Sequence, residues 1–170
     1  MLRLSSIRQD HSAAHTELHA YVVSDESAFV TLASSDSSYL RECLSLLFAR
    51  SGLLTSNQLR GLVRQLTSLL SDEDELQKES IEPSVASLDS LIDFLSDNDV
   101  TKHPRLSLSR TGNFSASWAP TRRAKLTITF KPYGVADWIG VDLDSSPPIH
   151  ARGHVAGGLP QTPFSDWIYT

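Results

Sequence analysis

Cysteine and long apolar runs are what this chain most clearly lacks. Cys43 is the single cysteine among 170 residues, which excludes an intramolecular disulfide and predicts a reducing, cytoplasmic location. No stretch approaches the ~18–20 apolar residues that cross a bilayer, so we expect no membrane association. Arg3 is not followed by an apolar run with a small-residue cleavage site, which predicts no secretory signal peptide.

Sequence motifs that are typical of enzyme active sites are missing as well. The sequence contains no glycine-rich phosphate loop, no nucleophile elbow and no His-Glu-x-x-His metal motif. Cys43 lies on the apolar stripe of an expected helix, where a thiol is a core side chain rather than an exposed nucleophile. We therefore expect a protein that is not an enzyme and needs no cofactor, although a site assembled from distant residues would leave no local motif.

Charge is distributed unevenly along the chain. Residues 71–99 hold ten carboxylates and one lysine, whereas residues 100–131 hold seven Lys and Arg and no acid. The whole chain has a net charge of −5. Neighbouring blocks of opposite sign are typical of solvated faces, and they also fit internal pairing or separate docking surfaces for a partner.

Apolar residues recur at helical spacing in three segments of the first hundred residues. Asp36 or Ser37 can cap the first segment, and Gly52 suits a left-handed stop after it. Thr55 and Gln58 form a capping box before the second segment. We expect helices over about 37–50, 56–71 and 84–97.

The acidic block divides into a run and a helix face. The run over 71–83, "SDEDELQKESIEP", ends at Pro83 and predicts a mobile surface connection. Asp89, Asp93 and Asp97 repeat every four residues, which predicts that they lie together on the outer side of the third helix.

From Pro104 onward the apolar period changes to two, the period of a half-buried strand. A three-residue loop over 110–112 pairs Leu108 with Phe114 and puts Gly112 where a left-handed residue is needed. A two-residue loop would place the two apolar sets on opposite faces, so we favour the three-residue register. The same reasoning puts Leu126, Ile128 and Phe130 in phase with Trp118, and predicts the pairs Leu106–Ala116, Ile128–Trp138 and Phe130–Ala136.

These patterns predict an α+β protein in which a mainly helical N-terminal region packs on a C-terminal antiparallel β-meander of about four strands. The helical region covers 1–100 and the meander, with an irregular C-terminal tail, covers 101–170, around one shared core. Residues 18–33 resemble a hairpin, although their first half also fits a helix, and residues 149–156 are a candidate further strand.

Three histidines near the N-terminus, His11, His15 and His19, are spaced by four. On a helix, neighbouring members lie ~6 Å apart and one pair could share an ion. On a strand they lie ~13 Å apart, too far for a single ion. A metal-dependent enzyme around these histidines is therefore one hypothesis, although the spacing identifies no third ligand.

A second hypothesis is a DNA-binding regulator. The segment over 55–70 resembles the second half of a helix-turn-helix, and Arg60 and Arg64 lie one turn apart on its polar side. The net acidity of the chain argues against a broad nucleic-acid surface, so contact with nucleic acid, directly or through a complex, stays an alternative.

Residues 83–138 combine a short helix, a Pro-led strand, a "GN" hairpin ending in Trp and a strand with a Gly turn. This stretch, about a third of the chain, resembles a pattern in small, uncharacterised bacterial proteins of mobile-element, toxin–antitoxin or defence contexts. Its matching positions are structural, so the resemblance carries over no catalytic residue. It implies an antitoxin, immunity or defence-complex subunit.

The leading hypothesis is a non-catalytic accessory that binds a protein partner. The separated charge blocks, the aromatic-rich sheet and the lack of a chemical motif favour it. The candidate contact residues are charged positions in loops and in the acidic run: Arg110, Arg122, Arg123, Lys125, Asp72, Glu73, Asp74 and Glu75.

Overall fold

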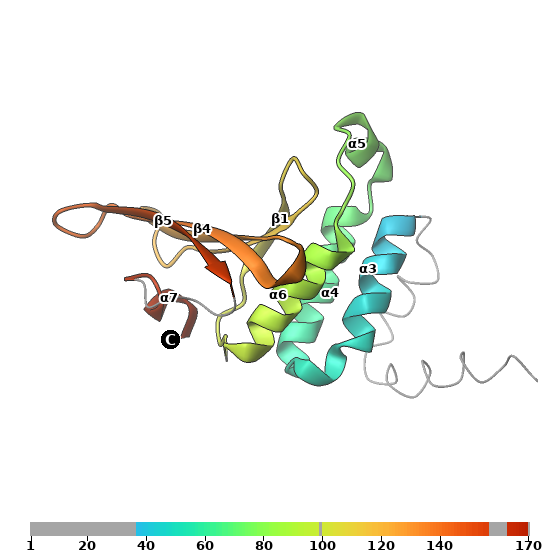
Figure 1. Cartoon of the computed structure of the whole chain (residues 1–170), viewed down its shortest axis with the longest axis horizontal. Helices are drawn as coiled ribbons and strands as arrows, with labels where there is room; N and C mark the ends of the chain where they lie inside the picture. The colour runs from blue at the N-terminus through green and yellow to red at the C-terminus, as the bar shows by residue number, and fades with distance from the viewer. Residues whose placement is uncertain (1–36, 99, 157–162, 170) are drawn as a thin grey trace, which may run out of the picture. The chain divides into compact units, whose positions relative to one another are not determined.

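Helices come first along the chain and an antiparallel sheet follows them (Figure 1). The computed structural model describes residues 37–98, 100–156 and 163–169. The expected α+β class is confirmed, with five strands rather than about four. The expected hairpin over 18–33 lies outside the described residues.

The helices begin where short polar side chains satisfy free backbone N–H groups. The hydroxyl of Ser37 accepts from the N–H of Leu40, and Thr55 with Gln58 forms the expected capping box. The hydroxyl of Ser84 does the same for the third long helix. The helices are α3 (Ser38–Ala49), α4 (Ser56–Leu70), α5 (Glu73–Lys78), α6 (Val85–Asp97) and α7 (Asp166–Tyr169).

Two local expectations were wrong. Gly52 does not have the left-handed backbone of a helix stop, because α3 passes into a 3-10 turn over Ser51–Leu53 that needs no such residue. The run over 71–83 is not merely a connection, because it contains α5. Leu76 is buried there, so one apolar side chain anchors an otherwise charged segment.

All strands pair with their neighbours in chain order, so the sheet is a simple meander. The tight turns lie where the sequence places them, with Gly112 (φ 75°) and Gly134 (φ 71°) in left-handed conformations. Residues 149–156 pair with β4 along their whole length and form the fifth strand. The strands are β1 (Arg105–Leu108), β2 (Phe114–Trp118), β3 (Ala124–Phe130), β4 (Val135–Asp142) and β5 (Ile149–Ala156).

The predicted register is also confirmed. Leu108 pairs with Phe114 across the first turn, so the three-residue loop is correct. A single buried face requires this phase, because a slip by one residue would turn every apolar side chain toward solvent. The other confirmed pairs are Leu106–Ala116, Ile128–Trp138 and Phe130–Ala136.

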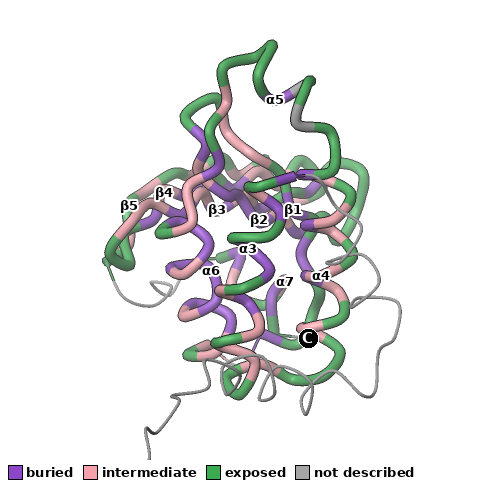
Figure 2. The backbone as a smooth tube through the Cα atoms, turned by 90° about the vertical axis from the view of Figure 1, so that its right-hand side faces the viewer, coloured by how far each residue is buried: buried purple, intermediate pink, exposed green. Residues whose placement is uncertain are grey.

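The core continues from the inner face of the sheet through α6 to the facing sides of α3 and α4, and buried positions concentrate there (Figure 2). The Phe94 ring of α6 lies 5.2 Å from the ring of Phe130 and 6.3 Å from that of Trp118, centroid to centroid. The hydroxyl of Ser87 donates to the Phe130 carbonyl (2.7 Å) and accepts from the Phe114 N–H (2.8 Å). This serine therefore ties α6 to the ends of β2 and β3.

Carboxylates of α6 face α3 rather than open solvent alone. The Arg50 guanidinium donates to Asp89 (2.9 Å) and to Asp93 (2.6 Å). Partial burial raises the pKa of Asp93, and the nearby Arg50 opposes that rise. Asp89 and Asp93 still lie on the outer side of α6, with side-chain exposures of 41% and 47%, and Arg50 at the end of α3 adds a cation beside them.

No helix in the described ranges is both long enough and apolar enough to cross a membrane.

Candidate binding face

The structure separates the basic loop residues that the sequence groups together. Arg110 lies in the β1–β2 turn, whereas Arg122 and Arg123 lie in the β2–β3 loop. Successive turns of an antiparallel meander lie at opposite ends of the sheet, so these loops cannot form one patch. Arg123 also lies 3.7 Å from a carboxylate oxygen of Asp144 in the β4–β5 loop. Lys125 is different, because it lies on β3 itself.

The acidic contact candidates lie at the start of α5. Asp72 immediately precedes this helix, and Glu73, Asp74 and Glu75 begin it. Asp72 and Asp74 are exposed. The run therefore lies beside the helices, not within a strand of the sheet.

The DNA-binding candidates lie on the exposed side of α4. Arg60 and Arg64 are both exposed, and the Arg60 guanidinium donates to Asn57 (2.8 Å). Six residues, 50–55, join α3 to α4, which is longer than the turn of roughly three to four residues in a helix-turn-helix.

The structure does not test the hypothesis of an N-terminal metal site, because His11, His15 and His19 precede residue 37, the first residue that it describes. Within the described ranges, no three His, Cys, Asp or Glu side chains gather closely enough to hold an ion. Cys43 is fully buried, and burial raises the pKa of its thiol to about 12, so the thiol stays protonated near neutral pH.

The sheet has a second, outward face that we call the open face, made by the strand residues that alternate with the core residues. One row crosses all five strands: Arg105 pairs with Ser117, followed across the sheet by Thr127, Ile139 and Arg152. With neighbouring strands ~4.8 Å apart, the two arginines mark the ends of a row roughly 19 Å long.

The open face is positively charged although the chain as a whole is acidic. Its one carboxylate among the described strand positions belongs to Asp137. Its other strand positions carry Ser, Thr, Val, Ile or Ala, apart from the basic and histidine side chains that lie on the face or, for Lys131, directly after β3: Arg105, Lys125, Lys131, His150, Arg152 and His154.

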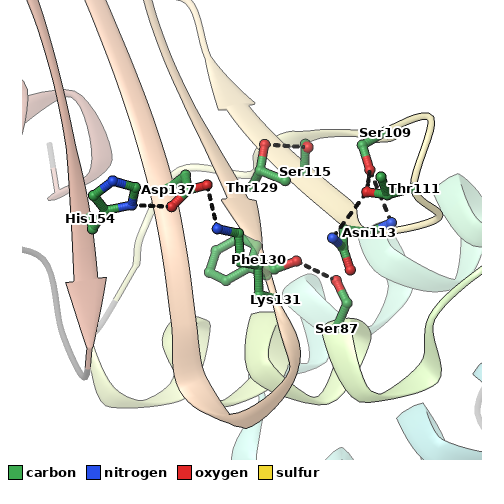
Figure 3. Close-up of polar contacts among 10 residues, drawn as sticks. All are labelled: Ser87, Ser109, Thr111, Asn113, Ser115, Thr129, Phe130, Lys131, Asp137 and His154. Atoms are coloured by element: carbon green, nitrogen blue, oxygen red, sulfur yellow. Dashed lines mark hydrogen bonds and ion pairs between the residues drawn. The ribbon is translucent and has the colours of Figure 1, made fainter.

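Asp137 is shared between two of these side chains (Figure 3). The Lys131 ammonium lies 2.7 Å from one carboxylate oxygen, and the His154 ring contacts the other. Lys131, together with His154, lowers the pKa of Asp137, although partial desolvation opposes the shift. The carboxylate is therefore ionised near neutral pH and already occupied, so it does not cancel the charge of Arg105, Lys125 or Arg152.

A groove opens at the corner of the open face where β1 begins and β2 ends. Its volume is about 650 Å³. Exposed Lys102, Arg105 and Lys125 line it together with the indoles of Trp118 and Trp167. None of these three cations pairs with a carboxylate of the described chain. An anionic group is the ligand that such a groove would attract.

Sequence reasoning identified Lys125, counted Arg105 only as one member of a basic cluster near the loops, and missed Arg152 and Ile139. The signal was present, because the alternation that identifies the core also identifies every residue facing the other way. Using it required the register of all five strands, and the fifth was only a candidate. Neither a protein-family model, nor a curated protein, nor a solved structure matches this chain.

Proposed function

We propose that the protein is a non-catalytic binding subunit whose open face docks an acidic segment of a protein partner. The charge of that face is the observation that carries the proposal. Lysine, arginine and histidine side chains surround one occupied carboxylate, in a chain of net charge −5. Such local charge, opposite to that of the whole molecule, favours a complementary partner and orients its approach.

The centre of the open face favours a protein as the partner. Ile139 is 60% exposed there, between Thr127 and Arg152 in the cross-strand row. Val141 lies on the same side of β4, and an exposed apolar side chain among polar and charged neighbours is typical of the middle of a protein–protein interface.

The same face is poorly suited to nucleic acid. Proteins that bind single strands stack bases on exposed aromatic rings. No outward strand position in the described part of the sheet carries Phe, Tyr or Trp. In the groove, Trp118 is only 4% exposed, and the half-buried Trp167 belongs to α7 rather than to a strand. The acidic helices would also repel a long polyanion.

The resemblance of residues 83–138 supports the same class of function, an antitoxin, immunity or defence-complex subunit. A cytoplasmic location fits the single, buried cysteine, which is the usual state of a thiol in a reducing compartment.

Affinity purification from the native host, with three forms of the full chain, tests this proposal. The first is the unchanged protein, and the second carries Arg105→Glu and Arg152→Glu on the open face. The third carries Arg60→Glu and Arg64→Glu on α4 and is matched in charge change. We expect the second form alone to lose the co-purifying protein, because reversed charges repel an acidic segment.

The other outcomes discriminate between the hypotheses. Loss with the α4 form alone would move the interface to α4, and a salt-sensitive mobility shift of duplex DNA that depends on Arg60 and Arg64 would then establish the DNA-binding alternative. Retention of the partner by both reversed forms would overturn the open face as the interface.

A further inference from the structure

The two edge strands of the sheet, β1 and β5, differ in whether a described side chain hydrogen-bonds to their outer backbone groups. On the β1 edge, the Gln65 side chain of α4 donates to the Pro104 carbonyl (2.9 Å) and accepts from the Leu106 N–H (2.8 Å). One amide group thus makes the two hydrogen bonds that a neighbouring strand would make. Gln65 therefore covers the start of the β1 edge, which is only four residues long.

No side chain of the described residues covers the β5 edge in this way. Ile149–Ala156 pairs with β4 at all eight positions without a bulge, and it contains neither proline nor lysine. Its backbone groups hydrogen-bond to β4 alone within the described ranges. Long, regular edges without these protective features are templates for another strand. In Figure 1, β5 lies at the border of the sheet, as the strand order requires.

We propose that β5 binds an extended acidic segment of the partner by strand addition, so that the five-stranded sheet gains a sixth strand. This inference rests on the proposed function, since it names how the acidic partner docks. Backbone hydrogen bonds supply the affinity in this mode of recognition, and side chains on alternate positions supply the specificity.

The outward positions of β5 identify the chemistry of the segment. His150, Arg152 and His154 are exposed on the same side of the strand. An added strand with Asp or Glu at every second position would set its carboxylates beside them. A second copy of β5 would instead bring Arg152 close to its own counterpart, which disfavours self-pairing.

The inward positions favour apolar side chains on the other half of the segment. Ala151, Gly153 and Val155 are only half-buried, so the inner side of β5 is incompletely covered. A cavity of about 150 Å³ lies beside Val155, with Phe94 and Phe130 among its apolar walls and with Asp93 and Asp97 also lining it, so it disfavours a carboxylate at these inward positions. The recognised segment therefore alternates acidic and medium-sized apolar residues.

A synthetic peptide of alternating Glu and Val, with blocked ends, is the probe, and its affinity for the full chain is measured by calorimetry. Two further peptides carry backbone N-methyl groups on the Glu residues or on the Val residues. Only one set of N–H groups can face β5, because alternate residues of a strand direct their N–H groups to opposite sides. We expect one methylated peptide to lose at least about tenfold in affinity and the other to lose little.

Variants of the chain complete the test. Arg152→Glu should weaken the unmethylated peptide by roughly tenfold, whereas the matched change Arg64→Glu on α4 should leave its affinity unchanged. Amide hydrogen exchange should slow in β5 when the peptide binds.

Three outcomes would overturn strand addition: no binding of the unmethylated peptide, equal affinity of both methylated peptides, or a β5-mediated dimer that the peptide does not dissociate. If host partner capture still depended on Arg105 and Arg152, the proposed function would stand, and the partner would lie on the open face without extending the sheet.

Discussion

At the scale of a single residue, Gly112 and Gly134 share a left-handed backbone conformation but differ in their surroundings. Alanine substitutions at the two positions therefore separate the cost of backbone strain from the cost of steric overlap. A Cβ on Gly112 would lie 1.7 Å from the Glu82 carbonyl oxygen, whereas nothing lies within 4 Å of a Cβ on Gly134. Gly134→Ala adds only left-handed strain and should cost about 1 kcal/mol of unfolding free energy. Gly112→Ala adds overlap with the segment before α6 and should cost at least about 2 kcal/mol more.

Chemical denaturation of both variants measures the difference. Because both substitutions place alanine at nearly equal positive φ, Gly134→Ala is the internal control for strain. Equal loss in the two variants would show that the chain before α6 is not held against the β1–β2 turn.

At the scale of an element, one serine holds α6 on the sheet. Ser87→Ala removes both the donor to the Phe130 carbonyl and the acceptor of the Phe114 N–H, and Ser87 is fully buried. Two backbone groups would lose their partner in the core, so we expect a loss of about 2–4 kcal/mol of unfolding free energy. Ser68→Ala, on the exposed side of α4, is the control and should change it by less than about 0.5 kcal/mol.

The unfolding free energies of the same two variants can also contradict this role of Ser87. If Ser87→Ala and Ser68→Ala were equally mild, water or a shift of α6 would replace the lost bonds. The position of the sheet on α6 would then depend on apolar packing, including that of Phe94, and on the Ser90–Gly134 hydrogen bond.

Elements that repeat a simple physical demand could be predicted from the sequence. Burying one face of each strand dictates an apolar residue at every second position, and this pattern is sufficient to pair Leu108 with Phe114. Elements that depend on long-range contacts could not be predicted this way. α5 depends on the burial of Leu76, and the Asp89–Arg50 pair depends on how α3 packs against α6.

The candidate site was less predictable than the fold for a related reason. Arg105 and Arg152 are far apart in the sequence and share a row only because five strands pair in order. Loop residues such as Arg110 and Arg122 are adjacent to conspicuous turns, yet the meander sends those turns to opposite ends. Charge composition alone therefore identifies a basic region without locating its face.

At the scale of the whole molecule, the carboxylates of α6 and the cations of the open face lie on different sides of the sheet. The acidic block supplies α5 and α6, and α6 covers the inner face of the sheet, whereas the cations line the open face. The chain can therefore attract an acidic segment to one side while its helices repel the same segment. The acidic run could either repel an acidic partner from a distance or contact the partner directly. These two roles predict opposite effects on binding when its carboxylates are neutralised.

The variant Asp72→Asn with Asp74→Asn distinguishes those two roles. If the run only repels an acidic partner from a distance, association with the Glu–Val peptide should stay equal or rise by up to about threefold. If the run itself contacts the partner, as the sequence suggested, capture of the host partner should fall. We expect the first result.

We also expect the rate of peptide association to drop roughly tenfold between 0.05 and 0.5 M salt. Arg105→Gln with Arg152→Gln should flatten that salt dependence, whereas an unchanged slope would mean that the open face does not steer the encounter.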